Sequence, residues 1–337
     1  MPYAIRGFGA WEDLVIKKWI MLAAIAAPAL SFTTPSQAYQ LAISQYGRVT
    51  ATLPWAVAIE KGYFTDAGIK IDQVIAGAGG GTTLRNVLAS DLPYGEVATS
   101  AAIAAKRSGL DVVIVNSSSS HIGEISLVTD PKSSIHAMAD LAGKKAGYTA
   151  PRSTSDVLLH LAIKESHLGG RVETVATGGF GPGLTALETG AIQAAPLIDP
   201  ILTLQPEKFR VVLHFADLIP RMTWLVGITT REFAKKNPEL LRKLIAVRLQ
   251  AVDFIYKNRD EAMRIYAKVW REDQQKVATY FPKYFGYDGE WTRGDFAKAG
   301  LAKMSEGLQL VGDVDKPVDW QAMIDQEFLP KDLQKPL

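Results

Sequence analysis

The amino-acid sequence predicts an α/β protein, and three observations carry that prediction. Short apolar or alternating segments are followed in turn by segments with helical spacing, which is the pattern of a parallel sheet flanked by helices. The chain has 337 residues, of which 47% are hydrophobic and 21% charged, as in soluble proteins of two ordinary domains. No repeat or low-complexity linker separates its parts, so we expect the backbone to cross between two domains on ordered strands.

The first 38 residues have the organisation of a secretory signal peptide. Lys17 and Lys18 precede an apolar run at 19–30, and small residues lead to Ala38. The run is shorter than the ~20 residues that a membrane-spanning helix needs. We therefore expect cleavage after Ala38 and export of a mature chain that begins at Tyr39 and does not span the membrane.

Residues 39–128 form the first series of alternating elements. Its predicted helices lie at 53–62, 82–91 and 101–109, and its predicted strands at 39–46, 69–76, 94–100 and 111–120. The segment IKIDQVIA alternates apolar and polar residues as a half-buried strand does. Thr82 or Thr83 can cap the helix that follows it. The segment DVVIVNSSSS is apolar enough for a buried strand that runs into a polar loop.

The second series follows at 138–215 and gives way to a helical C-terminal part. A short helix, a turn and a strand are predicted over 138–150, an amphipathic helix over 154–169, and further elements at 172–178 (strand), 181–190 (helix), 191–199 (strand) and 210–215 (strand). Residues 238–270 have almost continuous helical character, with Pro238 in the first turn, where its missing N–H costs nothing.

Composition and motifs argue against nucleic-acid binding and against catalysis. The formal net charge is +2, so there is no basic field to attract nucleic acid. The absence of cysteine excludes disulfides, thiolate metal sites and a cysteine nucleophile. The five histidines lack metal-ligand spacing, and no Gly-x-Ser-x-Gly elbow or acid–base pair of carboxylates is present. We expect a protein that is not an enzyme and needs no cofactor or metal.

The residues that follow the predicted strands are small, hydroxylated or glycine, with a few aromatic rings. In open α/β sheets, ligands bind beyond the carboxyl ends of the strands, where helix N-termini favour anions. Gly79–Gly81 lie between a strand and a helix, so they are either a tight turn or a surface for close approach to a ligand. Ser153 and Thr154 can cap a helix or bind a solute, and Arg152 is either an anion donor or a solvated side chain.

Four segments, in chain order, carry a family resemblance. They are PWAVAIEKGYFTDAGIKI, MADLAGKKAGYT, GLTALETGAIQAAPLIDP and ITTREFAKKNPELLRKLIAV. In this order they resemble the periplasmic substrate-binding proteins of the sulfonate, nitrate, taurine and thiamine-precursor group, over roughly residues 40–310. Gln193 stands where that family often has Asp, and we expect no effect on the fold.

The resemblance implies a two-lobed clamshell. Each lobe would be a parallel-dominated sheet flanked by helices, and the chain would cross between the lobes twice, near Thr129 and Met222. Lobe one would comprise 39–128 and 224–337, and lobe two 129–223. A periplasmic monomer of this kind closes over a small molecule and presents a face to the permease of an inner-membrane ABC transporter.

The resemblance also implies a set of residues that line the ligand site between the lobes. These residues are Arg48, Trp55, Gly79, Gly80, Ser100, Ala101, Ser117, His121, Ser153, Thr154, Phe180, Asp199 and Trp224. His121 is the one histidine that falls on this crevice, and a loop histidine without a ligand is the alternative for it.

The implied ligand is a small organic anion, a sulfonate or carboxylate that carries an apolar or aromatic part. Arg48, Arg152 and the helix N-termini favour an anion, while Trp55 and Phe180 favour a flat or apolar group. Asp199 would instead suit an amino group such as that of taurine. Two alternatives stay open: a binding protein that signals to a membrane receptor, and an importer component for a thiamine-pyrimidine precursor. The related pyrimidine synthase depends on a cysteine-rich motif that this chain lacks.

Overall fold

A mixed five-stranded sheet contains strands from the first part of the chain and one strand from beyond residue 220. The computed structural model describes residues 38–77 and 79–337, and the strand order in this sheet is β2-β1-β3-β10-β4. Its strands are β1 (Ala38–Ser44), β2 (Lys70–Gly77), β3 (Tyr94–Ala98), β4 (Val112–Ser119) and β10 (Leu225–Thr230). Strand β1 pairs in parallel with β2 and β3, whereas β10 is antiparallel to both its neighbours. We call this sheet and its helices lobe one.

A second group of strands forms lobe two. Its strands are β5 (Ile125–Thr129), β6 (Lys145–Tyr148), β7 (Glu173–Ala176), β8 (Ala195–Ile198) and β9 (Arg210–His214). Strand β5 is antiparallel to β8 and β9, β6 is parallel to β7, and a parallel bridge between Ala146 and Ala194 joins the two sheets. Strand β10 in lobe one and strand β5 in lobe two are therefore antiparallel to their neighbours. The chain enters each lobe from the other lobe on this antiparallel strand.

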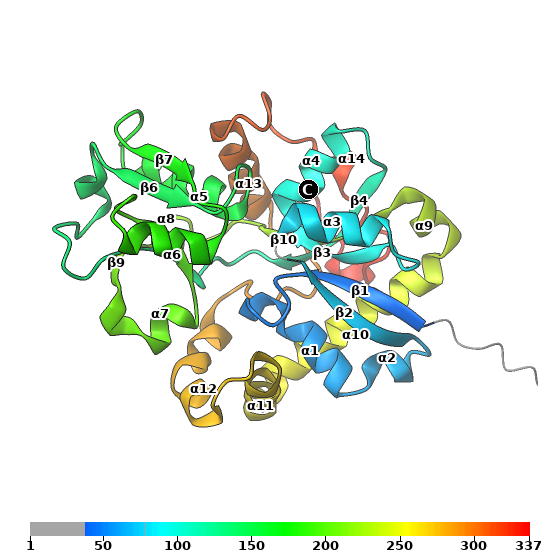
Figure 1. Ribbon diagram of the computed structural model, residues 1–337. Coiled ribbons are helices and arrows are strands. Elements are labelled where there is room, and N and C mark those ends of the chain that lie inside the picture. The colour runs from blue at the N-terminus through cyan, green and yellow to red at the C-terminus, as the bar shows by residue number, and fades with distance from the viewer. Residues whose placement is uncertain (1–37, 78) are drawn as a thin grey trace, which may run out of the picture. The chain divides into compact units, whose positions relative to one another are not determined.

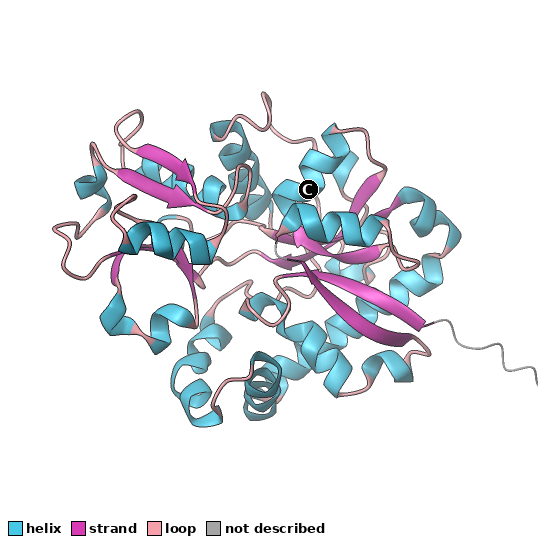
Figure 2. Cartoon of the chain, in the orientation of Figure 1, coloured by secondary structure: helices cyan, strands magenta, loops and turns pink. Residues whose placement is uncertain are grey.

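Helices flank the strands in both lobes (Figures 1 and 2). The helices of lobe one and of the C-terminal part are α1 (Leu53–Glu60), α2 (Tyr63–Asp66), α3 (Gly80–Leu88), α4 (Thr99–Arg107), α9 (Arg231–Lys236), α10 (Pro238–Lys257), α11 (Arg259–Trp270), α12 (Gln274–Tyr280), α13 (Lys298–Leu310) and α14 (Trp320–Met323). Those of lobe two are α5 (Thr154–Glu165), α6 (Phe180–Glu188), α7 (Ile201–Leu204) and α8 (Phe215–Leu218). The α/β prediction is confirmed, and in the described part of the chain no helix is long and apolar enough to cross a membrane.

The predicted helix at 238–270 is two helices. Asn258 has φ −128° and ψ 55°, outside the helical region, and it separates α10 from α11. Its side-chain amide donates to the Phe254 carbonyl at 3.2 Å. Asparagine side chains compete with the helical backbone for hydrogen bonds, so this residue favours a cap over a helix interior.

The first crossing between the lobes lies earlier than the expected position at Thr129. Strand β5 already pairs with β8 and β9, while Ser119 at the end of β4 still pairs with Leu225. The passage is thus made by residues 120–124. The apolar segment ISLVT has no feature that assigns it to one lobe, because a buried strand looks the same in either sheet. The lobe boundaries remain a proposal, with the first crossing moved to 120–124.

Helix α13 follows lobe-one residues in the chain but packs against α5 of lobe two (Figure 1). A Cβ added to Gly307 would lie 2.3 Å from Cγ1 of Val157, so the two helices approach as closely as glycine allows. Lys164 and Glu306 form an ion pair across the same contact. The expected assignment of all of 224–337 to lobe one does not anticipate this contact.

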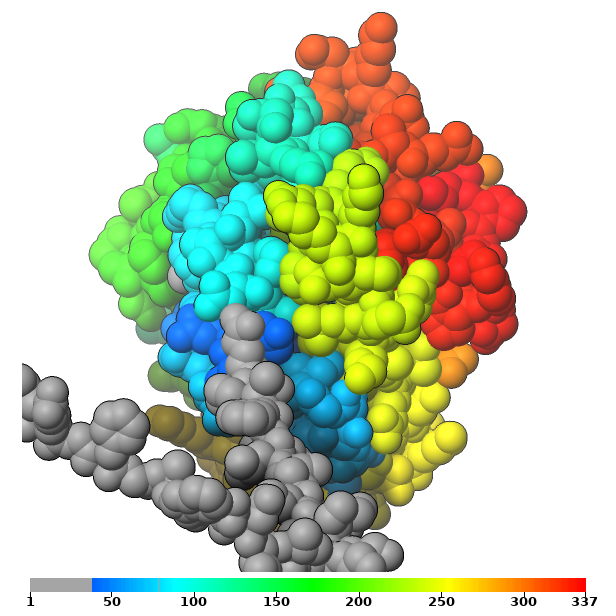
Figure 3. All heavy atoms as spheres, turned by 90° about the vertical axis from the view of Figure 1, so that its right-hand side faces the viewer, coloured from blue at the N-terminus to red at the C-terminus, as the bar shows by residue number. Residues whose placement is uncertain are grey.

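Side chains from distant segments hold the C-terminal part against lobe one. The Arg248 guanidinium is buried, forms an ion pair with the buried Glu96 and donates to the Ser118 carbonyl at 2.8 Å. Figure 3 shows the face on which the yellow-green α9 region lies between cyan and red segments, and Arg231 of α9 contacts Asp111 and the Ala322 carbonyl. The predicted signal peptide lies outside the described residues, apart from Ala38, which begins β1.

Candidate functional site

A cavity of about 710 Å³ is lined by residues of both lobes. The first turns of α3 and α4 reach it from lobe one, and those of α5 and α6 reach it from lobe two. The lining residues from these turns are Gly80, Gly81, Thr82, Ser100, Ala101, Thr154, Ser155, Phe180, Gly181 and Pro182. The two lobes thus direct four helix N-termini at one volume.

The first backbone N–H groups of a helix have no partner within the helix, and the helix dipole makes this end positive. In α5 the Ser153 hydroxyl accepts from the Asp156 N–H at 3.2 Å, which leaves the N–H groups of Thr154 and Ser155 for other acceptors. Gly79 precedes α3 and provides no side-chain cap at all. The cavity is therefore supplied with free N–H donors from both lobes.

The triple glycine allows α3 and α4 to start side by side. A Cβ on Gly80 would lie 2.8 Å from the Ala101 Cβ and 2.9 Å from the Ala98 Cβ, closer than carbon atoms pack. At Gly79 the same atom would meet nothing within 4 Å. Gly80 is thus needed for close approach of one helix to the other, and this approach puts two N-termini next to each other.

Three arginines line the cavity, and no aspartate or glutamate is among its lining residues. Arg48 forms no ion pair within the described chain, and Arg85 donates to the Thr82 hydroxyl at 3.1 Å. The Arg152 Nε lies 3.1 Å from Oδ1 of Asp313, which is outside the cavity. Sequence reasoning missed Arg85 because it lies in the second turn of α3, where a helical arginine is ordinarily a solvated side chain. The sequence did contain one signal: Arg85 lies three residues after Thr82, a spacing that places the two side chains on one face of a helix.

Nine of the thirteen residues expected at the site line this cavity. They are Arg48, Gly79, Gly80, Ser100, Ala101, Ser153, Thr154, Phe180 and Trp224. The Trp224 indole N–H donates to the His121 carbonyl at 2.8 Å, which holds the ring in place as one wall. Ser100 is buried and makes no side-chain hydrogen bond within the described residues, so its hydroxyl is free for a solute.

Trp55 and Ser117 lie in the core and not at the cavity. The Trp55 ring is fully buried between Phe64 and Tyr94, with centroid separations of 6.1 and 6.0 Å. Its position after the first strand suggested the crevice, but α1 turns the ring toward the sheet. Ser117 is buried within β4, and its N–H donates to the Gly294 carbonyl at 2.9 Å.

His121 and Asp199 lie near the crossings, also outside the cavity. His121 stacks on Tyr287 at 4.3 Å, and burial lowers the pKa of its imidazole. Asp199 forms an ion pair with Lys283 at 2.6 Å, in a smaller hollow. The carboxylate that would have opposed an anionic ligand therefore does not face the site.

A buried pair of carboxyl groups connects lobe one to the first crossing. The Thr50 hydroxyl lies 2.8 Å from Oε2 of Glu124 and 2.7 Å from Oε1 of Glu290. Burial raises the pKa of Glu124 to about 7 and holds the pKa of Glu290 well above its usual range. The Thr50 hydroxyl has one proton and can donate it to only one of the two carboxyl groups. This geometry therefore fits a Glu124–Glu290 pair in which at least one carboxyl keeps its proton.

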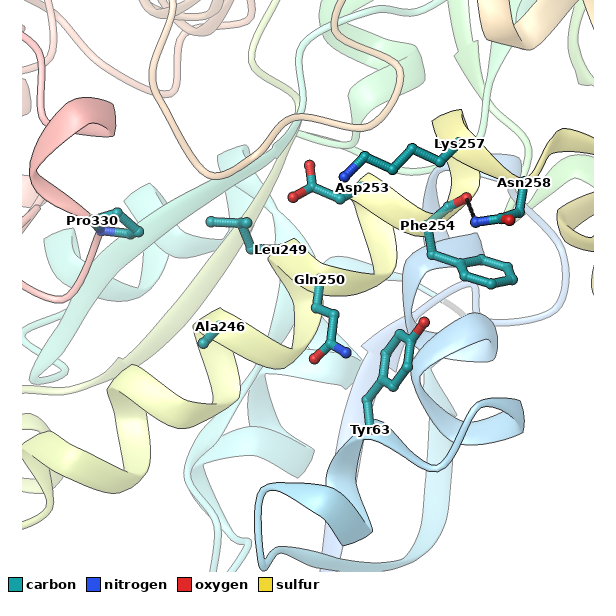
Figure 4. A pocket seen from close by; sticks show the side chains of 9 residues that line it. All are labelled: Tyr63, Ala246, Leu249, Gln250, Asp253, Phe254, Lys257, Asn258 and Pro330. Carbon is teal, nitrogen blue, oxygen red and sulfur yellow. Dashed lines mark hydrogen bonds between the residues drawn. The ribbon is translucent and has the colours of Figure 1, made fainter.

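A second hollow, of about 400 Å³, lies on the outer face of α10 (Figure 4). Tyr63 and Phe254 form its apolar wall, and Asp253 and Lys257 lie beside them. Its charges have both signs, and Asn258, the residue that precedes α11, is among its lining residues. Within the described residues no group of His, Cys, Asp or Glu could hold a metal ion.

Comparison with known proteins matches the chain to other binding proteins. The family model described as NMT1/THI5 like matches residues 50–262, more than half of the chain. A candidate binding protein of Brucella abortus (strain 2308) is 26% identical over 275 residues, which cover 78% of this chain and 83% of the relative.

Solved structures share the fold at low sequence identity. The periplasmic aliphatic sulphonate binding protein SsuA of Escherichia coli has a TM-score of 0.69 at 18% identity, covering 90% of this chain and 96% of that one. The ligand-binding component of an ABC-type import system of Staphylococcus aureus has a TM-score of 0.70 at 11% identity, covering 88% and 99%. The desulfurization enzyme DszB, solved as a cysteine-to-serine variant with biphenyl-2-sulfinic acid, has a TM-score of 0.64 at 16% identity, covering 87% and 98%. The chain has the two-lobed periplasmic-binding-protein fold, and it belongs to the NMT1/THI5 like family.

Proposed function

We propose that this protein is an exported solute-binding protein that captures a small organic anion between its lobes and delivers it to an inner-membrane ABC importer. One observation carries the proposal: four helix N-termini and three arginines meet at a cavity without a single acidic lining residue. Such a cavity attracts and desolvates an anion at low cost, because each lobe holds its own donors in place before the ligand arrives.

The ligand has an apolar or flat part in addition to its charge. Trp224 and Phe180 line the same cavity as the arginines, and its volume of about 710 Å³ exceeds what a small inorganic ion fills. An organic sulfonate or carboxylate satisfies both features. SsuA of Xanthomonas axonopodis pv. citri, an alkanesulfonate-binding protein solved with MOPS, has a TM-score of 0.68, 16% identity, and coverage of 87% and 99%.

Closure follows from the division of donors between the lobes. Helices α3 and α4 offer N–H groups from lobe one, and α5 and α6 offer them from lobe two. A ligand contacts all four only when the lobes are together, so binding shifts the population toward the closed form. The closed form is the one that a permease would recognise.

The alternatives are less well supported. A neutral or cationic thiamine-pyrimidine precursor would leave Arg48 and Arg85 without a countercharge, and Asp199 is not available to bind an amino group. The solved DszB variant replaces a cysteine, and this chain has none, which favours binding over catalysis of that kind. A membrane receptor could use the same closed form, and a copurifying permease and ATPase would separate the two partners.

A thermal-shift panel on the chain from Tyr39 onward tests the proposal. The panel contains taurine, alkyl and aryl sulfonates, nitrate, bicarbonate, aromatic carboxylates and hydroxymethylpyrimidine. A solute present at a thousandfold its Kd stabilises by about 4 kcal/mol, a shift of several degrees for a chain of this size. We expect the shift with organic sulfonates or carboxylates. A shift with hydroxymethylpyrimidine alone would overturn the anion assignment.

A further inference from the structure

We propose that Asp313 ties the two lobes together through one arginine from each, and that it orients Arg152 at the cavity. The inference rests on the proposed function. Nη1 of Arg107, in α4 of lobe one, lies 3.0 Å from Oδ1 of Asp313. Nε of Arg152, just before α5 of lobe two, lies 3.1 Å from the same oxygen. We call these three residues the Arg107–Asp313–Arg152 triad.

The Asp313 carboxylate is the buried centre of the triad. Its side chain is 0% exposed, whereas those of Arg107 and Arg152 are 49% and 60% exposed. A buried carboxylate is costly unless a cation stays beside it. Asp313 has an arginine from each lobe beside it, so when the lobes part the carboxylate keeps the arginine of the lobe with which it moves. The contact between the lobes can therefore form and break without leaving a buried charge alone.

The backbone of Arg152 is held in an unusual conformation. Its φ is +63°, in the left-handed region that favours glycine, and its N–H donates to Oδ2 of Asp156 at 2.7 Å. A long charged residue in this region carries strain, and such strain is concentrated at sites where the side chain has a task. We infer that an arginine stands at this position for its side chain, since the backbone conformation alone would favour glycine.

The orientation of the guanidinium indicates the task. Arg152 meets Asp313 with its Nε, and its two terminal Nη groups make no hydrogen bond with the described residues. Arg152 also lines the cavity, whereas Asp313 does not. Asp313 is thus a positioning residue: it holds one side of the guanidinium and leaves the other for an anion. Arg107 of lobe one and Arg152 of lobe two can share the Asp313 oxygen only when the lobes are together.

Replacing Asp313 turns the attraction between the lobes at this contact into a repulsion. In the Asp313→Asn variant, the two guanidinium groups would face each other without the negative charge that neutralised them, and like charges repel. In the Arg152→Gly variant the tie is lost without new repulsion, and the positive-φ strain is relieved. We therefore expect a larger opening in Asp313→Asn than in Arg152→Gly. Asp315→Asn is the matched control, since Asp315 is exposed and forms no ion pair in the described chain.

The experiment measures the distance between the lobes and the affinity for MOPS in the same variants. Spin labels on Glu188→Cys in α6 and Lys235→Cys in α9 report the distance, because both side chains are exposed and the chain has no cysteine of its own. We expect Asp313→Asn to lengthen the distance and to weaken MOPS binding about tenfold, because the apparent Kd rises as the closed population falls. Arg152→Gly should lengthen the distance less but weaken MOPS binding at least as much, because it also removes the guanidinium that faces the anion, and Asp315→Asn should match the wild type.

Unchanged distances in both Asp313→Asn and Arg152→Gly would overturn the inference. If Asp313→Asn fails to fold, Arg152→Gly decides alone, since a glycine at positive φ does not strain the chain. If the wild type does not bind MOPS, the proposed sulfonate ligand loses support, while the distances still decide whether the triad ties the lobes.

Discussion

At the scale of single residues, the Glu124–Glu290 pair makes stability depend on pH. Both carboxyls are buried within hydrogen-bonding distance of the Thr50 hydroxyl, and burial raises the pKa of Glu124 to about 7 and that of Glu290 well above its usual range. A carboxyl whose pKa is raised on folding stabilises the fold fully below its unfolded pKa of about 4.5, and this contribution is lost as the pH rises through the folded value.

The free energy of unfolding should accordingly fall between pH 5 and pH 8, by on the order of 2 kcal/mol. Glu290→Gln keeps the shape of the carboxyl without its charge, so this decline should be smaller and the variant should be more stable than the wild type at pH 8. Urea denaturation at the two pH values measures both effects. Glu188→Gln, at an exposed position, is the control, and a decline in Glu290→Gln as steep as in the wild type would contradict the prediction.

Gly80 and Gly79 offer a matched pair of substitutions. Gly80→Ala puts a Cβ 2.8 Å from that of Ala101, so α3 must move away from α4, which should cost about 1–3 kcal/mol of stability and weaken ligand binding. Gly79→Ala meets nothing within 4 Å and has extended backbone, so it should leave the stability unchanged. Thermal unfolding compares the two, and equal stability of both variants would show that the close approach is not required.

Another prediction for a single residue concerns Trp55, which the structure places in the core and not at the cavity. The ring is fully buried against Phe64 and Tyr94, so Trp55→Ala should remove core packing and cost about 3–5 kcal/mol of stability. Chemical denaturation measures the loss. A Trp55→Ala variant that keeps its stability and loses only ligand binding would contradict this prediction and would show that Trp55 belongs to the ligand site.

At the scale of elements, α13 is the helix whose packing departs from its place in the chain. Gly307 lets it lie directly against α5, and Gly307→Ala would put a Cβ 2.3 Å from Val157. We expect a loss of about 1–3 kcal/mol in the free energy of unfolding, although alanine has the higher helix propensity. Denaturation of Gly307→Ala beside Gly286→Ala, where a Cβ meets nothing within 4 Å, measures it. A more stable Gly307→Ala would show that propensity outweighs the contact.

At the scale of the whole molecule, ligand binding and lobe closure should be one event. The donors of the cavity come from both lobes, so a solute that raises the melting temperature should also shorten the distance between labels at positions 188 and 235. The matched control is a solute from the panel that does not change the melting temperature. Stabilisation without shortening would mean that the ligand binds to one lobe only.

The sequence by itself determined the fold class, the order of the elements and nine of the residues around the cavity. Strand and helix periods are local properties, and in an α/β sheet the residues after parallel strands must meet at one edge, so the chain order placed Gly80 and Ser100 together, while the family resemblance implied that Thr154 faces them from the other lobe. Only the tertiary structure decided where side chains point and what lies beside them. Trp55 and Ser117 turned into the core, Asp199 was neutralised by Lys283, and Arg85 entered the cavity. It also brought Asp313 to Arg152, 161 positions apart (313 − 152), because such a contact depends on packing between helices that no local pattern encodes.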